Sequence, residues 1–156
     1  MTIAVWRDEY HTGHPEIDQQ HQQLFQLVNQ IHHLTQSEQP DHAAIYSQLN
    51  EFASCAITHF DLEEALMAQH GYPNFAVHCQ THRALVNKVQ TLLTKFDQTA
   101  ETQVAVVTEV LADWMVHHIR GEDRQMIRFF QASNAVEISG SLISTGIERI
   151  AELSQA

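Results

Sequence analysis

The chain has 156 residues, a length that suits a single domain of ordinary size. Hydrophobic residues make up 44% of it and charged residues 17%, which excludes a disordered or fibrous protein. The formal net charge of -11 disfavours binding to nucleic acids or to anionic membranes. The start of the chain does not resemble a signal peptide, and no apolar run approaches ~18 residues. Since neither secretion nor membrane spanning is supported, we expect a cytoplasmic protein. Two cysteines, Cys55 and Cys79, are too few for a disulfide framework, so we expect reduced thiols.

Periodic apolar positions predict four long helices in chain order. The first runs from about Asp18 to Thr35, and the second from the turn at residues 37–41 to Gly71. The third starts after Asn74, which can cap it, and ends near residues 97–101; the fourth covers about residues 104–130. Strand-like alternation is absent from the sequence. Four helices joined by short turns predict an all-α protein, an up-down-up-down four-helix bundle.

A shorter fifth helix is predicted beyond Ser133. Apolar residues recur there at helical spacing, at Val136, Ile143, Ile147 and Ile150. We therefore divide the chain into a bundle domain, residues 1–133, and a C-terminal helical extension, residues 134–156. An isolated helix would leave this apolar stripe in water, so we expect it to pack on the bundle or on another subunit of a homo-oligomer.

Histidine is unusually frequent, with 12 residues, and several histidines fall on the apolar faces of the predicted helices. Six polar residues hold positions where the pattern alone would predict Leu or Ile, namely His21, His59, Glu63, His78, His82 and His118. One such histidine is ordinarily a hydrogen-bonded core residue, but six unpaired polar groups would unfold a small core. Two pairs, His59 with Glu63 and His78 with His82, are spaced four residues apart and so share a helix face. The pattern predicts a buried metal centre.

The motifs that carry these residues resemble those of the bacterial hemerythrins over about Trp6 to Phe130. They read PEIDQQH ending at His21, HFDLEEALM from His59, GYP followed by HCQTH ending at His82, and DWMVHHIRGED ending at Asp123. Two features depart from the family pattern, namely His117 beside His118 and a tail that is longer than a minimal domain needs.

The resemblance implies two iron ions per chain with an oxo or hydroxo bridge. By analogy, Glu63 and Asp123 bridge the irons, His78, His82 and His118 bind one iron, and His21 and His59 bind the other. Counting ligands for two six-coordinate irons leaves one vacancy, on the iron with two histidines. The implied function is reversible O2 binding, as a carrier, store or sensor, with small anions such as azide as competitors. Six apolar residues are expected to shield the site from water: Leu24, Phe25, Phe60, Trp114, Met115 and Ile119.

Two alternative functions stay open at this stage. One is a di-iron enzyme with weak oxidase, peroxidase or nitric oxide activity, and the other is an iron-dependent sensor module. The Glu-x-x-His pairs of ferritin-like di-iron proteins are absent from the chain, which argues against strong oxidase chemistry. A zinc hydrolase is disfavoured because the sequence lacks His-Glu-x-x-His. We therefore expect a ligand-binding protein and not an enzyme.

Four further assignments depend on local spacing. Asp18 could support His21 or cap the first helix, and we favour the cap. Cys55 lies one turn before His59, but we interpret it as a packing residue.

The last ligand depends on the regularity of the fourth helix. On a regular helix Glu122, four residues after His118, would face the site, whereas the family motif selects Asp123. Asp123 can reach the site if the helix loosens near Gly121. The other histidines are assigned to the surface or the termini: His11, His14, His32, His33, His42, His70 and His117.

Overall fold

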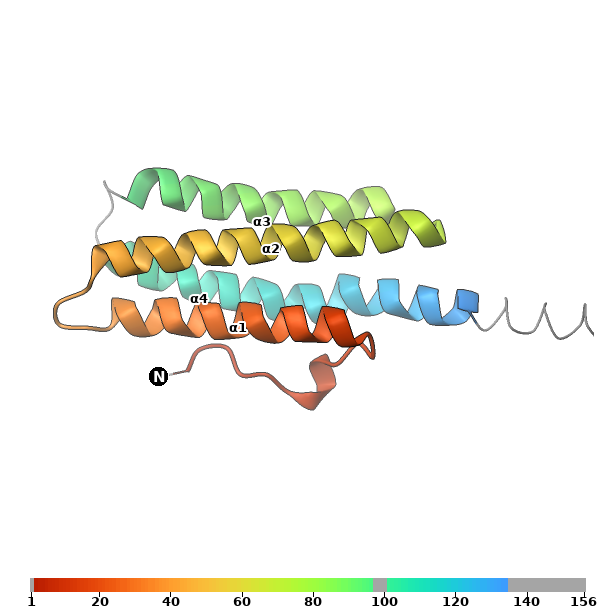
Figure 1. Cartoon of the computed structure of the whole chain (residues 1–156), viewed down its shortest axis with the longest axis horizontal. Coiled ribbons are helices and arrows are strands. Elements are labelled where there is room, and N and C mark those ends of the chain that lie inside the picture. Colours follow the sequence, from red (N-terminus) through yellow and green to blue (C-terminus); the bar gives the residue numbers. More distant parts are fainter. Residues whose placement is uncertain (1, 97–100, 135–156) are drawn as a thin grey trace, which may run out of the picture.

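The structure is a computed structural model that describes residues 2–96 and 101–134, and the side chains of residues 101–103 are not described. Four long helices run alternately up and down (Figure 1): α1 (Pro15–Thr35), α2 (His42–His70), α3 (Phe75–Lys95) and α4 (Glu101–His118). Helix α1 packs against α2 and α4, and α2 packs against α3. No strand occurs in the described ranges. The predicted all-α up-down-up-down bundle is confirmed, while the predicted helix within residues 134–156 lies, apart from Asn134, outside the described residues.

The fourth helix has an irregular turn in its middle. After α4, residues Ile119–Asp123 form a π-helical turn, η3, and regular helix resumes over residues 124–134. A π turn accommodates one more residue than an α-helical turn, so it changes the direction in which the following side chains point. This turn lies beside the predicted metal ligands.

The ends of the helices differ in part from the predicted ones. Helix α1 begins at Pro15, where the side chain of His14 accepts a hydrogen bond from the backbone N–H of Ile17. The prediction that Asp18 caps this helix was wrong, because Asp18 lies inside the first turn. Helix α2 starts after Asp41, whose carboxylate accepts from Ala44 N–H, and stops at Gly71, which adopts a left-handed conformation with φ of 62°.

Helix α3 follows Asn74, as predicted, but the Asn74 side chain makes no capping hydrogen bond. Its backbone carbonyl instead accepts from the N–H of His78 at 3.0 Å. Phe75 is 37% exposed because it occupies the first turn of the helix, at the end of the bundle.

Two apolar clusters fill the interior. The main cluster runs along all four helices and includes Val28, Leu49, Phe52, Leu85 and Leu111. A smaller end cluster lies near the η3 end of the bundle and comprises Ile17, Met67, Tyr72, Cys79, Met126, Ile127 and Phe130. The seven predicted ligands lie where members of the main cluster give way to members of the end cluster. The seven predicted ligands thus form a polar layer between two apolar regions.

An N-terminal arm, residues 2–14, lies along α1 (Figure 1) and contains the short 3-10 helix η1 (Asp8–Tyr10). The Asn29 side chain binds the arm by accepting from the N–H groups of Ile3 and Ala4 and by donating to the Ala4 carbonyl. His32 is one helical turn beyond Asn29 and is buried, with 5% of its surface exposed. The assignment of His32 to the surface was therefore wrong, because an extended segment packs on a helix face that was expected to meet solvent.

None of the helices in the described ranges is long and apolar enough to cross a membrane.

Candidate metal centre

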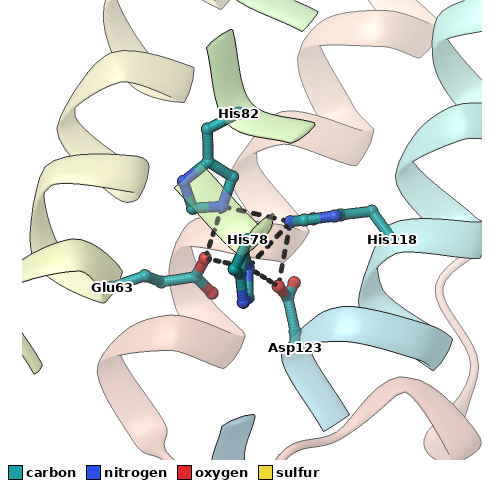
Figure 2. A group of neighbouring side chains, drawn as sticks. All are labelled: Glu63, His78, His82, His118 and Asp123. Carbon is teal, nitrogen blue, oxygen red and sulfur yellow. Dashed lines mark hydrogen bonds and ion pairs between the residues drawn. The ribbon is translucent and has the colours of Figure 1, made fainter. Parts of the chain in front are cut away.

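Seven side chains of the polar layer form two overlapping groups with metal-binding atoms. One group contains Glu63, His78, His82, His118 and Asp123, and Figure 2 shows these five side chains pointing toward one another. The second group contains His21, His59, Glu63 and Asp123. Within each group the ligand atoms lie within 4.8 Å of one another, and all seven residues are 0–4% exposed. The structure thus brings together all seven residues predicted as metal ligands.

The helix geometry explains why these side chains meet. His59 and Glu63 project from one face of α2, and His78 and His82 project from one face of α3, because residues four apart lie one turn above each other. His21 adds a ligand atom from α1, and the α4–η3 segment supplies the last two residues. Each helix of the bundle contributes to the centre, which is a common arrangement for metal sites in helical bundles.

Asp123, and not Glu122, points into the site. Asp123 is fully buried, and its Oδ1 lies 3.0 Å from His118 Nε2. The Glu122 side chain is 40% exposed, with Oε2 at 3.5 Å from the outer nitrogen, Nδ1, of His118. The π turn produces this exchange, because the additional residue in η3 places the fifth residue after His118 where a regular helix would place the fourth. A Cβ atom at Gly121 would meet open space, so the turn does not need glycine for steric reasons.

The two oxygens of each carboxylate face different histidines. Asp123 Oδ2 lies 3.0 Å from His21 Nε2, while Asp123 Oδ1 lies 3.1 Å from His78 Nε2. Glu63 Oε1 is 3.3 Å from His59 Nε2, while Glu63 Oε2 is 3.1 Å from His82 Nε2. Each carboxylate therefore spans the space between the two groups of histidines.

These short distances are not ordinary hydrogen bonds. None of the four oxygens of Glu63 and Asp123 has a correctly aligned hydrogen-bond donor among the described residues, and neither does His21 Nε2. Every ion-pair partner of the two carboxylates in the described ranges is a histidine. Buried carboxylates without aligned donors are costly, whereas a cation at the common focus would satisfy them all. The imidazole and carboxylate donor set suits a divalent transition metal such as iron or zinc.

Without a metal, protonated histidines balance the negative charges of the two buried carboxylates. Burial opposes protonation of His118, but the negative charge of Asp123 outweighs it and raises the pKa of His118 to about 10. Burial likewise opposes protonation of His78, and its close contact with Asp123 raises that pKa to about 9. The pKa of Glu63 falls to about 2, because the surrounding imidazoles outweigh burial and the repulsion from Asp123. Two imidazolium ions then neutralise two carboxylates.

His59 behaves differently from these two histidines. Burial dominates its environment and lowers its pKa to about 4, in spite of the nearby Glu63 carboxylate. His59 is therefore neutral at pH 7, with its Nδ1 bonded to Gln20 and its Nε2 facing the site. The histidines of the centre thus differ in charge before any metal binds.

Four polar residues surround the ligands; three of them escaped the sequence analysis, and the fourth, Glu122, was considered there only as a possible ligand. Gln20, Glu64, Thr81 and Glu122 contact the outer nitrogens of the histidines His59, His82 and His118. All four are direct neighbours in sequence of a predicted ligand, because Gln20 precedes His21, Glu64 follows Glu63, Thr81 precedes His82 and Glu122 precedes Asp123. Adjacency to a predicted ligand was the sequence feature that could have identified these residues. Side chains of adjacent residues on a helix point about 100° apart, however, so adjacency alone predicts no contact.

A small apolar cavity adjoins the centre. Its volume of about 10 Å³ is close to the ~10–15 Å³ that one water-sized molecule requires. Its lining comprises His21, Leu24, His59, Phe60, Leu85, Trp114, Met115, His118 and Ile119. Five of the six predicted shielding residues line it, whereas Phe25 instead packs against Trp6 and Tyr10 of the N-terminal arm.

The remaining candidates lie away from the centre. Asp18 accepts hydrogen bonds from the N–H groups of Thr12 and Gly13, so it anchors the arm and does not support His21. Cys55 packs against the main cluster with its thiol 3.7 Å from Glu51, as predicted for a packing residue. Among the other histidines, His11, His33, His42 and His117 are exposed, as assigned, and His14 and His70 are half-buried.

Comparisons with known proteins identify relatives that match most of the chain. The hemerythrin HHE cation binding domain family matches residues 12–130. A bacteriohemerythrin from Stenotrophomonas maltophilia is 32% identical over 124 residues, which cover 80% of this chain and 79% of the relative. A bacteriohemerythrin from Methylococcus capsulatus is 30% identical over 125 residues, covering 80% and 94%. A crystal structure of wild-type hemerythrin superposes with a TM-score of 0.70 at 28% identity, covering 78% of this chain and 92% of that one.

Proposed function

Because the chain belongs to the hemerythrin HHE cation-binding family, we propose that it binds O2 reversibly at two iron ions held by the polar layer. One observation carries this proposal: two buried groups of ligand atoms share Glu63 and Asp123. A pair of ferrous ions supplies the two electrons that O2 takes up and returns. The protein holds the pair, admits a small ligand and excludes water.

We propose a division of the ligands between the two irons that agrees with the distances at the carboxylates. His78, His82 and His118 hold one iron, His21 and His59 hold the other, and Glu63 and Asp123 bridge them. This division is supported by the way each carboxylate directs one oxygen toward each group of histidines. An oxo or hydroxo bridge between the irons completes the proposed cofactor.

The O2 site is proposed on the iron with two histidines. His21 and His59 both line the apolar cavity, and that iron has fewer protein ligands than the other. Leu24, Met115 and Ile119 exclude water from this cavity, so few protons reach a bound ligand, which favours release over reduction. For the same reason we propose a binding protein and not an enzyme.

The proposed setting is a reducing compartment, the cytoplasm. Both cysteines of the chain, Cys55 and Cys79, are free thiols in the structure. Free thiols are usual where glutathione and thioredoxin keep cysteines reduced.

The test is an iron and O2 measurement on the purified protein. We expect two irons per chain, a coloured oxidised form, and a spectrum that changes reversibly through repeated cycles of O2 addition and removal. Azide, a small anion, is expected to compete for the same vacancy. Stoichiometric zinc in place of iron would contradict the proposal, and steady consumption of O2 or peroxide would favour the di-iron enzyme instead.

A further inference from the structure

Two of the three histidines in the three-histidine group, His82 and His118, are backed by carboxylates, whereas His78 Nδ1 has no hydrogen-bond partner among the described residues. Glu64 Oε1 lies 3.1 Å from the outer nitrogen, Nδ1, of His82. Glu122 Oε2 lies 3.5 Å from Nδ1 of His118, whose other neighbour there is the Thr81 hydroxyl, also at 3.5 Å. Both carboxylates are partly exposed, and neither belongs to the two ligand groups. Glu64 lies where it accepts the Nδ1–H of His82, and Glu122 lies at ion-pair distance from Nδ1 of His118, so both leave Nε2 of their histidine free to face the centre.

The histidines of the two-histidine group lack such charged support. His59 Nδ1 lies 2.9 Å from the amide oxygen of Gln20, which is neutral. His21 Nδ1 has no hydrogen-bond partner among the described residues. Two of the three histidines in one group therefore have a carboxylate behind the imidazole, whereas neither histidine of the other group has one.

Ring packing also distinguishes His82 and His118, whereas the ring contacts of His78 are edge-on. The Phe60 ring stacks on His82 with centroids 3.9 Å apart and an angle of 10°, and Trp114 stacks on His118 at 4.6 Å and 14°. The ring contacts of His21 and His59 are tilted or edge-on, including their mutual contact at 68°. Flat stacking combined with an Nδ1 contact fixes the orientation of an imidazole, so His82 and His118 are more strongly positioned before any metal binds.

We infer that Glu64 and Glu122 are positioning residues that make the three-histidine metal position the tighter of the two, so that it fills first. This inference rests on the proposed two-metal site. A carboxylate behind a ligand histidine fixes its tautomer and increases its basicity, and loss of such a partner typically lowers metal affinity about 10–100-fold. Unequal ligand numbers alone also make the positions unequal, so the test must change the outer carboxylates while every ligand stays in place.

The experiment is an anaerobic titration of the metal-stripped full chain with Co(II), followed by visible absorption, which reports occupancy without any O2 chemistry. For the wild type we expect two binding steps that add up to two cobalt ions per chain. In Glu64→Gln the tighter step weakens by about 10–100-fold, and the weaker step changes little. In Gln20→Glu, which places a carboxylate behind His59, the weaker step tightens.

Asp61→Asn is the matched control. Asp61 lines the same surface pocket as Glu64 but contacts no ligand histidine, so its loss removes an equal charge without removing support for His82. We expect this variant to titrate like the wild type. Glu122→Gln is the second test variant, with a smaller effect in the same direction because its contact is longer.

The outcomes separate the two proposals. If the wild type binds two cobalt ions and Glu64→Gln and Glu122→Gln shift neither step, or shift both steps equally, the inference is overturned while the two-metal site stands. The same holds if Asp61→Asn matches Glu64→Gln, because general electrostatics would then explain the change. If the wild type binds fewer than two ions, the proposed function fails and the inference fails with it.

Discussion

At the scale of single residues, substitutions of Asp123 and Glu122 test which of the two carboxylates binds the metal. Asp123→Ala removes a carboxylate that faces both groups of histidines, so we expect the variant to lose iron or to stop binding O2 stably. Glu122→Ala removes a partly exposed side chain that contacts only an outer nitrogen, so this variant still takes up two irons when iron is in excess. Iron content and O2 difference spectra measure both. The opposite ranking would assign the ligand to Glu122.

Protonation of His78 and His118 makes the stability of the metal-free protein depend on pH. Their pKa values of about 9 and about 10 lie above the ordinary ~6.5, so protonation of these residues stabilises the metal-free fold. That stabilisation is complete below pH ~6.5 and is lost as the pH rises through about 9 and about 10.

A metal needs the free electron pairs of these imidazoles, so metal binding at pH 7.5 is expected to release about two protons from His78 and His118. The release is measured by titrating weakly buffered, metal-stripped protein with Co(II) in a pH-stat. His117→Gln is the control, because His117 is exposed and should leave the number unchanged. Release of the same number of protons at pH 10.5 as at pH 7.5 would refute this account.

The sequence predicted the buried polar cluster because polar residues occupy positions in apolar stripes. A histidine or glutamate in an apolar stripe signals a compensating partner, and this signal identified His21, His59 and Glu63 together with three further histidines. The same signal did not identify Gln20 and Glu64, because polar residues are usual at half-exposed positions of a helix.

At the scale of helices, the role of the π turn is tested by deleting single residues from the fourth helix. Deleting Gly121 removes the additional residue, so a regular helix would place Asp123 in the site and keep Met126 and Phe130 in the end cluster. We expect this deletion to retain metal binding and near wild-type stability, as measured by metal content and thermal unfolding.

Deleting Gln125, which is exposed, is the matched control. It leaves the π turn intact but rotates the following helix by about 100°. Met126, Ile127 and Phe130 would then turn away from the end cluster, at a cost of roughly 5 kcal/mol at ~1.5–3 kcal/mol for each buried side chain. Equal stability of the two deletions would show that the π turn is not the element that sets the register.

The helices themselves were largely predictable, and their ends were less so. Apolar periodicity located all four, since it reflects which face must be buried. The start of α1 was missed by three residues, because Pro15 and the cap at His14 resemble an irregular lead when read without structure. His32 lies one turn beyond Asn29, which binds the N-terminal arm, and the arm has no periodic pattern, so no local signal predicted the burial of His32.

For the whole molecule, the extension over residues 134–156 stays a prediction. Its apolar stripe is expected to pack on the bundle or on another subunit. Truncation after Ser133 should therefore alter the oligomeric state, the thermal stability or the O2 dissociation rate, as measured by light scattering, calorimetry and stopped flow. If all three stay unchanged, the extension has neither a structural nor a regulatory role.

The polar layer between the main and end clusters ties the amount of folded protein to the supply of iron. A ligand that binds only the folded state adds ~1.4 kcal/mol of stability for each tenfold rise of its free concentration above the dissociation constant. When iron is scarce, a larger fraction of chains is unfolded and open to proteolysis. Under iron limitation the metal-free chains would therefore be degraded first, so the amount of this protein would follow the iron supply without any dedicated regulator.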